Sequence, residues 1–300
     1  MHYINSPFSE VFVNGLPFII KRDDLLDVRF SGNKARKLYY FIKNDFPSIK
    51  KIVSFGGSQS NFMYALSELA KVKLWSFDYY TRELSRVLKN QPEGNIKLSL
   101  DNGMKLIEVD NRQLNLTEIR DFYQSQEGIY FFNQGGRQEE CKLGMMQLAD
   151  EIIKYVNKLK ILKYSIYLPS GTGASAFYLQ QFLPETYVKT CACVGSSQYL
   201  LSQMQSLTMG KDVNYPIILD SKHKFNFGQL DNRLLDMYKK LQLETNITFD
   251  LLYDPIGWIT LLENYHIFNE DPIIYIHCGG LSGNETMLNR YRRYEYRSIL

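Results

Sequence analysis

The chain has 300 residues, of which 35 are Lys or Arg and 32 are Asp or Glu, so its formal net charge at pH 7 is +3. This balance argues against a dedicated nucleic-acid-binding protein, and 45% apolar with 22% charged residues is typical of a folded globular chain. Four cysteines are too few for a disulfide scaffold. We find no signal peptide and no apolar run near the ~18 residues of a membrane helix, and therefore expect a cytoplasmic protein without a membrane partner.

The apolar pattern predicts short strands that alternate with glycine turns and helices. In chain order, the expected strands are residues 52–55, 74–77, 105–109, 129–132, 164–168, 190–194 and 273–276, and the expected helices are 62–70, 85–100, 145–156 and 176–183. The second of these helices is interrupted around Pro92 and Gly94, and residues 205–230 have no regular pattern. We expect Cys191 and Cys193 on one face of a buried strand, because strand side chains alternate. Repeated strand, turn and helix indicate an α/β fold with parallel sheets.

One glycine turn, SGTGAS at residues 170–175, follows a predicted strand and precedes a predicted helix. Its small residues allow backbone N–H groups to approach an anion, and the helix adds the positive end of its dipole. The hydroxyls of Thr172 and Ser175 can donate as well. No Lys-Ser or Lys-Thr pair follows, so this is not a Walker loop. A phosphate site and an ordinary tight turn both fit the pattern.

Lys34 lies at the start of a further predicted helix, which reaches Ile42. A lysine in such a place is usually a solvated charge, but Arg36 and Lys37 stand close by. Neighbouring cations and burial lower the pKa of an amine, and a lowered pKa is what an imine-forming lysine requires.

A polar segment follows the strand at 52–55, with Ser58, Gln59, Ser60 and Asn61 at the start of the next helix. These residues are either helix caps or ligands of a substrate carboxylate. A phosphate cradle, an imine-forming lysine and a polar helix start on parallel sheets together indicate pyridoxal phosphate as the cofactor.

Four segments of the chain resemble the 1-aminocyclopropane-1-carboxylate deaminase / D-cysteine desulfhydrase family. The matching segments are GNKARKL at 32–38, GGSQSN at 56–61, SGTGAS at 170–175 and IHCGG at 276–280, in the family's order and spacing. Residues 23–25, 94–95 and 254–255 match as well. The resemblance implies two domains with parallel-sheet α/β cores, in the tryptophan-synthase-beta-like architecture of fold type II pyridoxal-phosphate enzymes. A smaller domain at 37–140 would be inserted into a large cofactor-binding domain of residues 1–36 and 141–300.

The resemblance also implies roles for single residues. Lys34 would be the Schiff-base lysine and would move the substrate proton, and Asn61 would contact the ring hydroxyl of the cofactor. Ser60 would hold the substrate carboxylate, with Ser58 and Gln59 beside it. The implied phosphate ligands are Lys37, Gly171, Thr172, Gly173, Ala174 and Ser175. The implied activity is release of ammonia and a 2-keto acid from a small amino acid, and the family favours a homodimer.

The chain departs from the family pattern at several polar positions. Phe62 and Phe227 replace polar residues, and Phe227 stands on the substrate side. Gly257 replaces a tyrosine, and Trp258 replaces an acid that partners the pyridine nitrogen in the deaminase branch. Cys278 replaces a threonine that takes this role in the desulfhydrase branch. Since a phenyl ring neither donates nor accepts a conventional hydrogen bond, we expect an altered substrate or weak activity.

Three alternatives stay open from the sequence. One is a D-cysteine desulfhydrase-type lyase, and another is a catalytically weakened relative that binds a ligand at the same place. The third is nucleic-acid binding through Arg290, Arg292, Arg293 and Arg297 among tyrosines, although a solvated terminal helix or an oligomer contact fits this short run better. We expect His277 to pack at a strand end close to the cofactor ring.

Overall fold

The computed structural model describes residues 3–30, 32–109, 116–208, 213–269 and 271–298. Its strands are β1 Phe8–Val13, β2 Leu16–Arg22, β3 Lys51–Phe55, β4 Ser76–Arg82, β5 Lys105–Val109, β6 Ile129–Phe132, β7 Ser165–Ser170, β8 Val188–Ala192, β9 Ile217–Leu219 and β10 Ile273–His277. Its α-helices are α1 Asn33–Lys37, α2 Tyr39–Lys43, α3 Asn61–Lys73, α4 Arg86–Asn90, α5 Asn95–Asp101, α6 Leu116–Gln124, α7 Cys141–Lys158, α8 Ala174–Phe182, α9 Ser197–Gln205, α10 Asn232–Thr245, α11 Asp254–Glu263 and α12 Asn284–Ser298. Short 3-10 helices are η1 Asp23–Leu25, η2 Val28–Phe30, η3 Tyr265–Phe268 and η4 Leu281–Gly283.

The strands form two sheets. One has six strands in the order β1-β2-β10-β7-β8-β9, and the other has four in the order β5-β4-β3-β6. Neighbouring strands pair in parallel, apart from β1 and β2, which form an antiparallel hairpin. The pattern analysis did not predict this hairpin. Its turn is Asn14-Gly15, and both residues have the positive φ that a two-residue hairpin loop requires.

Helices cover both faces of the six-stranded sheet, because its inner strands are apolar on both sides. Ile166 and Leu168 of β7 face a core formed with α7 and α8, whereas Tyr167 faces one formed with α10 and α11. Cys191 and Cys193 both lie buried in the second core with their sulfur atoms 3.9 Å apart. The predicted alternation of these cysteines is confirmed.

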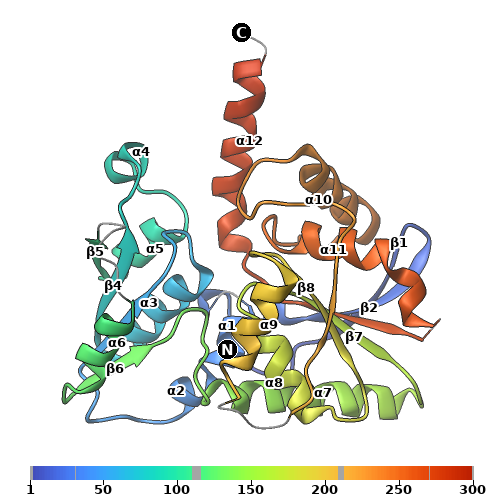
Figure 1. The fold of residues 1–300 in the computed structure, drawn as a ribbon, viewed down its shortest axis with the longest axis horizontal. Helices are drawn as coiled ribbons and strands as arrows, with labels where there is room; N and C mark the ends of the chain where they lie inside the picture. The colour runs from blue at the N-terminus through green and yellow to red at the C-terminus, as the bar shows by residue number, and fades with distance from the viewer. Residues whose placement is uncertain (1–2, 31, 110–115, 209–212, 270, 299–300) are drawn as a thin grey trace.

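The four-stranded sheet has a separate core, to which α3 contributes most of its apolar face. Figure 1 shows the two sheets on opposite sides of the view, with α1 between them and α12 extending away from both. The helix α1 packs against α3, from the core of the four-stranded sheet, and against α7, from the core of the six-stranded sheet. A change of backbone direction at Leu38 separates α1 from α2, so the single helix predicted up to Ile42 is two short ones.

The predicted strands coincide with observed strands, with one clear difference in position. The strand predicted at 74–77 begins only at Ser76, because Leu74 ends α3 in the left-handed conformation and is exposed. The helix predicted at 85–100 is divided into α4 and α5 around Pro92 and Gly94, as expected. The irregular stretch 205–230 contains β9, and its residues 209–212 lie outside the described part of the chain.

The predicted domain boundaries stay a prediction, and the one at 36/37 falls inside α1. Within the described ranges, no helix has both the length and the apolar character needed to span a lipid bilayer.

Candidate active site

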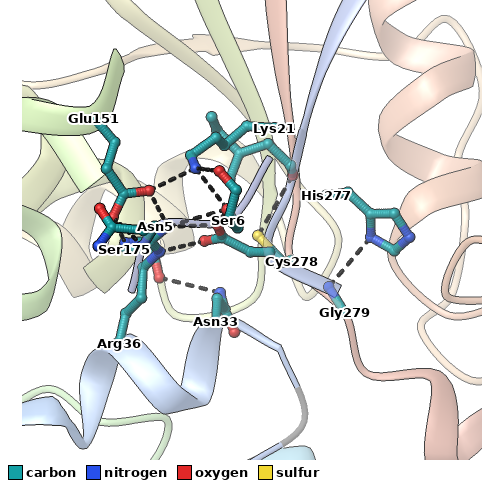
Figure 2. Close-up of polar contacts among 12 residues, drawn as sticks. Asn5, Ser6, Lys21, Asn33, Arg36, Glu151, Ser175, His277, Cys278 and Gly279 are labelled. Atoms are coloured by element: carbon teal, nitrogen blue, oxygen red, sulfur yellow. Dashed lines mark hydrogen bonds and ion pairs between the residues drawn. The ribbon is translucent and has the colours of Figure 1, made fainter. Parts of the chain in front are cut away.

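The start of α1 is joined to the end of β10 by a close backbone contact. The N–H of Asn33 donates to the carbonyl of Cys278 (2.9 Å), and a Cβ added at Gly32 would overlap this carbonyl. Gly32 also has a φ of +68°, so both the close contact and the backbone conformation require glycine at this position. Nδ2 of Asn33 donates to Oγ of Ser175 at 3.5 Å (Figure 2). Three of the four matching segments therefore meet here.

The segment at 56–61 reaches the same place from the four-stranded sheet. Oδ1 of Asn61 accepts a hydrogen bond from Nδ2 of Asn95 (2.8 Å), and Oδ1 of Asn95 accepts one from Oγ of Ser282, after β10 (2.7 Å). A Cβ added at Gly280 would lie 2.6 Å from Nδ2 of Asn61. All four segments thus converge at the ends of β3, β7 and β10, the edge at which parallel sheets bind ligands.

Ser60 and Gln59 have structural contacts in this segment. Ser60 is the N-cap of α3, and its Oγ accepts from the N–H groups of Phe62 and Met63, both at 3.2 Å. The side chain of Gln59 donates to the carbonyl of Glu93 (2.9 Å) and accepts from the N–H at position 95 (3.0 Å). Their predicted contacts with a substrate, and that of Ser58, stay predictions.

Lys34 follows Asn33 on α1, and its amine donates to Oδ1 of Asn33. Burial lowers the pKa of Lys34, and the nearby Cys278 and Asp250 oppose this only in part. Among the residues that the structure describes, Lys34 forms no salt bridge. A buried amine without a paired counter-charge loses its proton more readily, and the neutral amine is the nucleophile that forms an imine.

Lys37 reaches the loop after β6. Its Nζ donates to the carbonyl of Gly135 (2.7 Å), and burial together with the charge of Lys34 lowers its pKa to about 8. Gly135 borders the turn at 170–175, since a Cβ added there would lie 2.9 Å from Oγ1 of Thr172. Lys37 therefore lies close to the predicted phosphate turn.

The turn at 170–175 is held in place from both ends. Gly173, at φ +74°, is the N-cap of α8, and a Cβ there would lie 2.7 Å from Met204. Oγ1 of Thr190 donates to the carbonyl of Leu168 (2.7 Å) and also lies within hydrogen-bond distance of Oγ of Ser170 (2.7 Å). The first N–H groups of α8 have no partners within the helix, which is the usual basis of an anion site.

A phenol that the pattern analysis missed lies beside this turn. Tyr253 precedes α11, and a Cβ added at Gly171 would lie 3.4 Å from its Oη. The Tyr253 ring packs against Phe227 with ring centroids 4.8 Å apart, and Phe227 is 37% exposed. Burial raises the pKa of Tyr253, so its hydroxyl stays protonated and can donate. Its place directly before the Asp254-Pro255 match was the signal available in the sequence.

Asp250 is a second residue that the pattern analysis did not select. Its Oδ1 accepts from the N–H groups of Leu252 (2.8 Å) and Tyr253 (2.6 Å). Its Oδ2 is buried and has no hydrogen-bond partner in the described part of the chain. A Cβ added at Gly280 would lie 3.0 Å from this atom. Burial and the charge of Asp254 raise the pKa of Asp250 to about 7.

Cys278 and His277 differ in what they can offer. Burial raises the pKa of the Cys278 thiol to about 12, so the thiol is neutral near pH 7. His277 is fully buried, its Nδ1 accepts from the N–H of Gly279 (3.2 Å, Figure 2), and its Nε2 lies 2.8 Å from the carbonyl of Thr248. Its ring stacks on Phe249 with centroids 4.6 Å apart. His277 therefore packs at a strand end.

Two of the departures from the family pattern are core positions. Phe62 is buried in the core of the four-stranded sheet. Trp258 is buried on α11 and stacks on Tyr275 with centroids 4.5 Å apart. At Gly257, a Cβ would lie 3.0 Å from Pro169, so a larger side chain there would meet the end of β7. Positions 257 and 258 thus supply no polar side chain to the turn.

A network of buried charges holds the other side of α1 (Figure 2). The guanidinium of Arg36 bonds to both carboxylate oxygens of Asp23 (2.6 and 2.7 Å) and to both of Glu151 (2.9 and 2.8 Å). Nζ of Lys21 contacts Glu151 and Oγ of Ser6, each at 2.5 Å. Burial raises the pKa of Glu151, but Arg36 and Lys21 outweigh it and bring the pKa to about 2. We call these five residues the α1 charge cluster.

The basic residues of α12 are partly engaged within the chain. Nη1 of Arg290 donates to the carbonyl of Gly228 (2.7 Å), and Nη2 of Arg293 pairs with Glu93 (3.1 Å). Arg292 is exposed, and the side chain of Arg297 lies outside the described residues. These contacts anchor the helix to both halves of the chain.

The donor set fits pyridoxal phosphate. The turn at 170–175 suits a phosphate, the Lys34 amine suits an aldehyde, and Nδ2 of Asn61 suits a ring hydroxyl. The unpartnered Oδ2 of Asp250 beside Gly280, where a Cβ would fill the space, marks a place for a further polar atom of a ligand.

No family model matches the chain. A Thermotoga maritima protein with the provisional name 1-aminocyclopropane-1-carboxylate deaminase is 22% identical over 294 residues, which cover 90% of this chain and 90% of that protein. The D-cysteine desulfhydrase of Serratia proteamaculans is 25% identical over 298 residues, covering 89% of this chain and 87% of that protein. The crystal structure of an ACC deaminase homologue matches with a TM-score of 0.72 at 20% identity, over 95% of this chain and 93% of that chain.

These matches extend over nearly the full length of both partners, and they agree with the convergence of the four segments in the fold. The chain is therefore similar over nearly its full length to proteins named 1-aminocyclopropane-1-carboxylate deaminase and D-cysteine desulfhydrase, and it has the fold type II architecture of pyridoxal-phosphate enzymes.

Proposed function

We propose that this protein is a pyridoxal-phosphate-dependent deaminase or lyase that converts a small amino acid into a 2-keto acid and ammonia. One observation carries the proposal. Four segments that are far apart in the chain meet around one partly buried amine, that of Lys34, whose pKa is lowered by desolvation. When bound, pyridoxal phosphate withdraws electrons from the α-carbon of an attached amino acid.

The chain would hold the cofactor at three points. The N–H groups of residues 171–175, with the hydroxyls of Thr172 and Ser175, would bind the phosphate, and Lys37 and Tyr253 would add a charge and a hydroxyl donor. Asn61 would donate from Nδ2 to the ring hydroxyl, because its Oδ1 is already engaged by Asn95. These contacts would fix the ring beside the Lys34 amine.

The same residues would position a substrate. The N-terminal end of α3, with Ser58 and Ser60, offers partial positive charge to a substrate carboxylate. Lys34 Nζ would accept the α-proton, because an amine with a lowered pKa is partly neutral near physiological pH. Phe227, packed on Tyr253 and partly exposed, would border the substrate side.

Absorbance spectroscopy tests the proposal. Pyridoxal phosphate added to the purified chain should give the visible band of a lysine imine, and Lys34→Ala should abolish it. The matched control is Lys97→Ala, which removes an exposed lysine paired with Asp101 on α5 and should keep the band. A band that survives in Lys34→Ala, or no band in the wild-type protein, would contradict the proposal.

A D-cysteine desulfhydrase-type reaction is the second candidate. It is favoured by the 25% identity to the Serratia enzyme and by Trp258, which takes the place of the acid that the resemblance assigns to the deaminase branch. Both reactions consume water and release ammonia with a keto acid, and D-cysteine also releases sulfide. Separate assays of ammonia and sulfide, with 1-aminocyclopropane-1-carboxylate and with D-cysteine, distinguish them. A band without turnover of either would favour the ligand-binding relative.

The proposal includes a cytoplasmic homodimer, which the family favours. Light scattering on the purified protein would measure the mass of the assembly directly.

A further inference from the structure

The carboxylate of Asp250 carries an oxygen atom for which the described residues supply no partner. Asp250 is 1% exposed. Two backbone N–H groups at the start of α11 hold Oδ1, at 2.8 and 2.6 Å, and this fixes the orientation of the carboxylate. Oδ2 has no hydrogen-bond partner in the described ranges. Burying such an atom without a partner is unfavourable, so its presence calls for a ligand atom.

The unpartnered oxygen borders the same space as Asn61. A Cβ added at Gly280 would lie 3.0 Å from Oδ2 of Asp250 and 2.6 Å from Nδ2 of Asn61. Gly280 has a φ of +96°, which L-residues rarely adopt, so this space stays free of a side chain. The acceptor Oδ2 of Asp250 and the donor Nδ2 of Asn61 lie on separate segments and therefore border the same space beside Gly280.

The chemistry of the cofactor relates these two atoms. Under the proposed function, Asn61 contacts the ring hydroxyl of pyridoxal phosphate. The ring nitrogen lies on the same edge of the pyridine, one ring carbon beyond the carbon that carries the hydroxyl. An acceptor next to Asn61 is therefore placed to meet a proton on that nitrogen.

We infer that Asp250 is the partner of the protonated ring nitrogen of bound pyridoxal phosphate. This inference rests on the proposed function and moves the role away from the two positions that the sequence match indicates. Trp258, in place of the acid, is buried against Tyr275, and Cys278 carries a neutral thiol, a weak hydrogen-bonding group. A carboxylate instead stabilises the proton, and a protonated ring withdraws electrons more strongly.

The charges around Asp250 suit this role. Burial and Asp254 on α11 disfavour its ionised form, whereas Lys34 on α1 favours it, and Tyr238 and Tyr253 are the other titratable groups facing it. A protonated ring nitrogen would add a positive charge to that of Lys34. The protonated ring nitrogen and the ionised carboxylate of Asp250 would therefore stabilise each other.

Nitrogen NMR of the full-length protein, loaded with pyridoxal phosphate that is isotope-labelled in the ring, reads the protonation state directly. At neutral pH the wild-type protein should show a protonated ring nitrogen, and Asp250→Asn should show an unprotonated one. The visible imine band should persist in Asp250→Asn, because Lys34 and the phosphate turn are unchanged. Cys278→Ala is the matched control and should give the wild-type signal.

An unprotonated nitrogen in the wild type, or an unchanged signal in Asp250→Asn, would overturn the inference and leave the proposed function standing. Loss of protonation in Cys278→Ala would transfer the role to the thiol and overturn it as well. Should Asp250→Asn fail to fold, Asp250→Ser removes the same charge and is judged by the same signal. A wild-type protein without an imine band would overturn the proposed function and this inference together.

Discussion

Lys34 and Arg36 stand on the same short helix, and the structure surrounds their charges in opposite ways. Arg36 is fully buried and makes paired contacts with the carboxylates of Asp23 and Glu151. Lys34 is partly buried, donates to Asn33 and forms no salt bridge among the described residues. A paired buried charge holds structure in place, whereas an unpaired one has a shifted pKa and is available for chemistry.

Helix geometry explains why Lys34 and Arg36 have different surroundings. Successive residues of an α-helix are rotated by about 100°, so positions 34 and 36 face nearly opposite sides. One side of α1 meets α7 and β2, where the α1 charge cluster lies, and the other meets the ends of β7 and β10. A helix of five residues has little stability of its own, so the cluster fixes the position of Lys34.

The strongest test of this comparison is Arg36→Met. It leaves the buried Asp23 without its cation and Glu151 with Lys21 alone, and we expect the free energy of unfolding to fall by roughly 3–5 kcal/mol. Urea denaturation measures the loss. Arg233→Met, which removes an exposed pair with Asp231 on α10, should cost at most about 1 kcal/mol. Equal small losses in both variants would show that the cluster does not hold α1.

Glu151 and Asp250, one on each side of α1, should give opposite dependences of stability on pH. The folded-state pKa of Glu151 is about 2, below its usual 4.5, so its contribution is fully present above about pH 4.5 and is lost as the pH falls through about 2. The pKa of Asp250 is raised from 3.8 to about 7. The folded protein without cofactor therefore binds that proton more tightly, and stability falls as the pH rises from about 4 to about 7.

Urea unfolding of the cofactor-free protein over a pH series measures both the loss of stability at acid pH and the loss near neutral pH. Glu151→Gln should reduce the loss of stability at acid pH and Asp250→Asn the loss near neutral pH, each by roughly 3–4 kcal/mol. If the loss of stability near neutral pH persists in Asp250→Asn, it comes from another group, and Asp254 is the first to examine.

The smallest expected effect is that of Tyr253→Phe. The change removes a hydroxyl beside Gly171 and keeps the ring that packs on Phe227. Loss of one hydrogen bond to a charged phosphate should weaken pyridoxal phosphate binding by roughly tenfold, measured by titration of the imine band. Tyr187→Phe, at an exposed position, is the control and should not change the affinity. Equal affinities in the two variants would remove Tyr253 from the phosphate site.

The sequence was most informative where local rules decide. Strands appear as apolar runs and the turn at 170–175 as small residues between a strand and a helix, so both could be predicted. The hairpin of β1 and β2 was missed, although Asn14-Gly15 is a typical hairpin signal. Asp250 could not be found in this way, because its lone acid carries no local motif and its meaning depends on Gly280 and Asn61.

By itself, the sequence determined the resemblance to a known family, the α/β architecture and the four segments that match, because these depend on residue type, order and spacing along the chain. Only the tertiary structure decided which polar groups stand where. It placed Trp258 in a core, put Tyr253 beside the phosphate turn and left one oxygen of Asp250 without a partner among the described residues. The physical reason is that burial and pairing arise between segments distant in sequence, and these contacts decide whether a charge holds the fold together or is kept for a ligand.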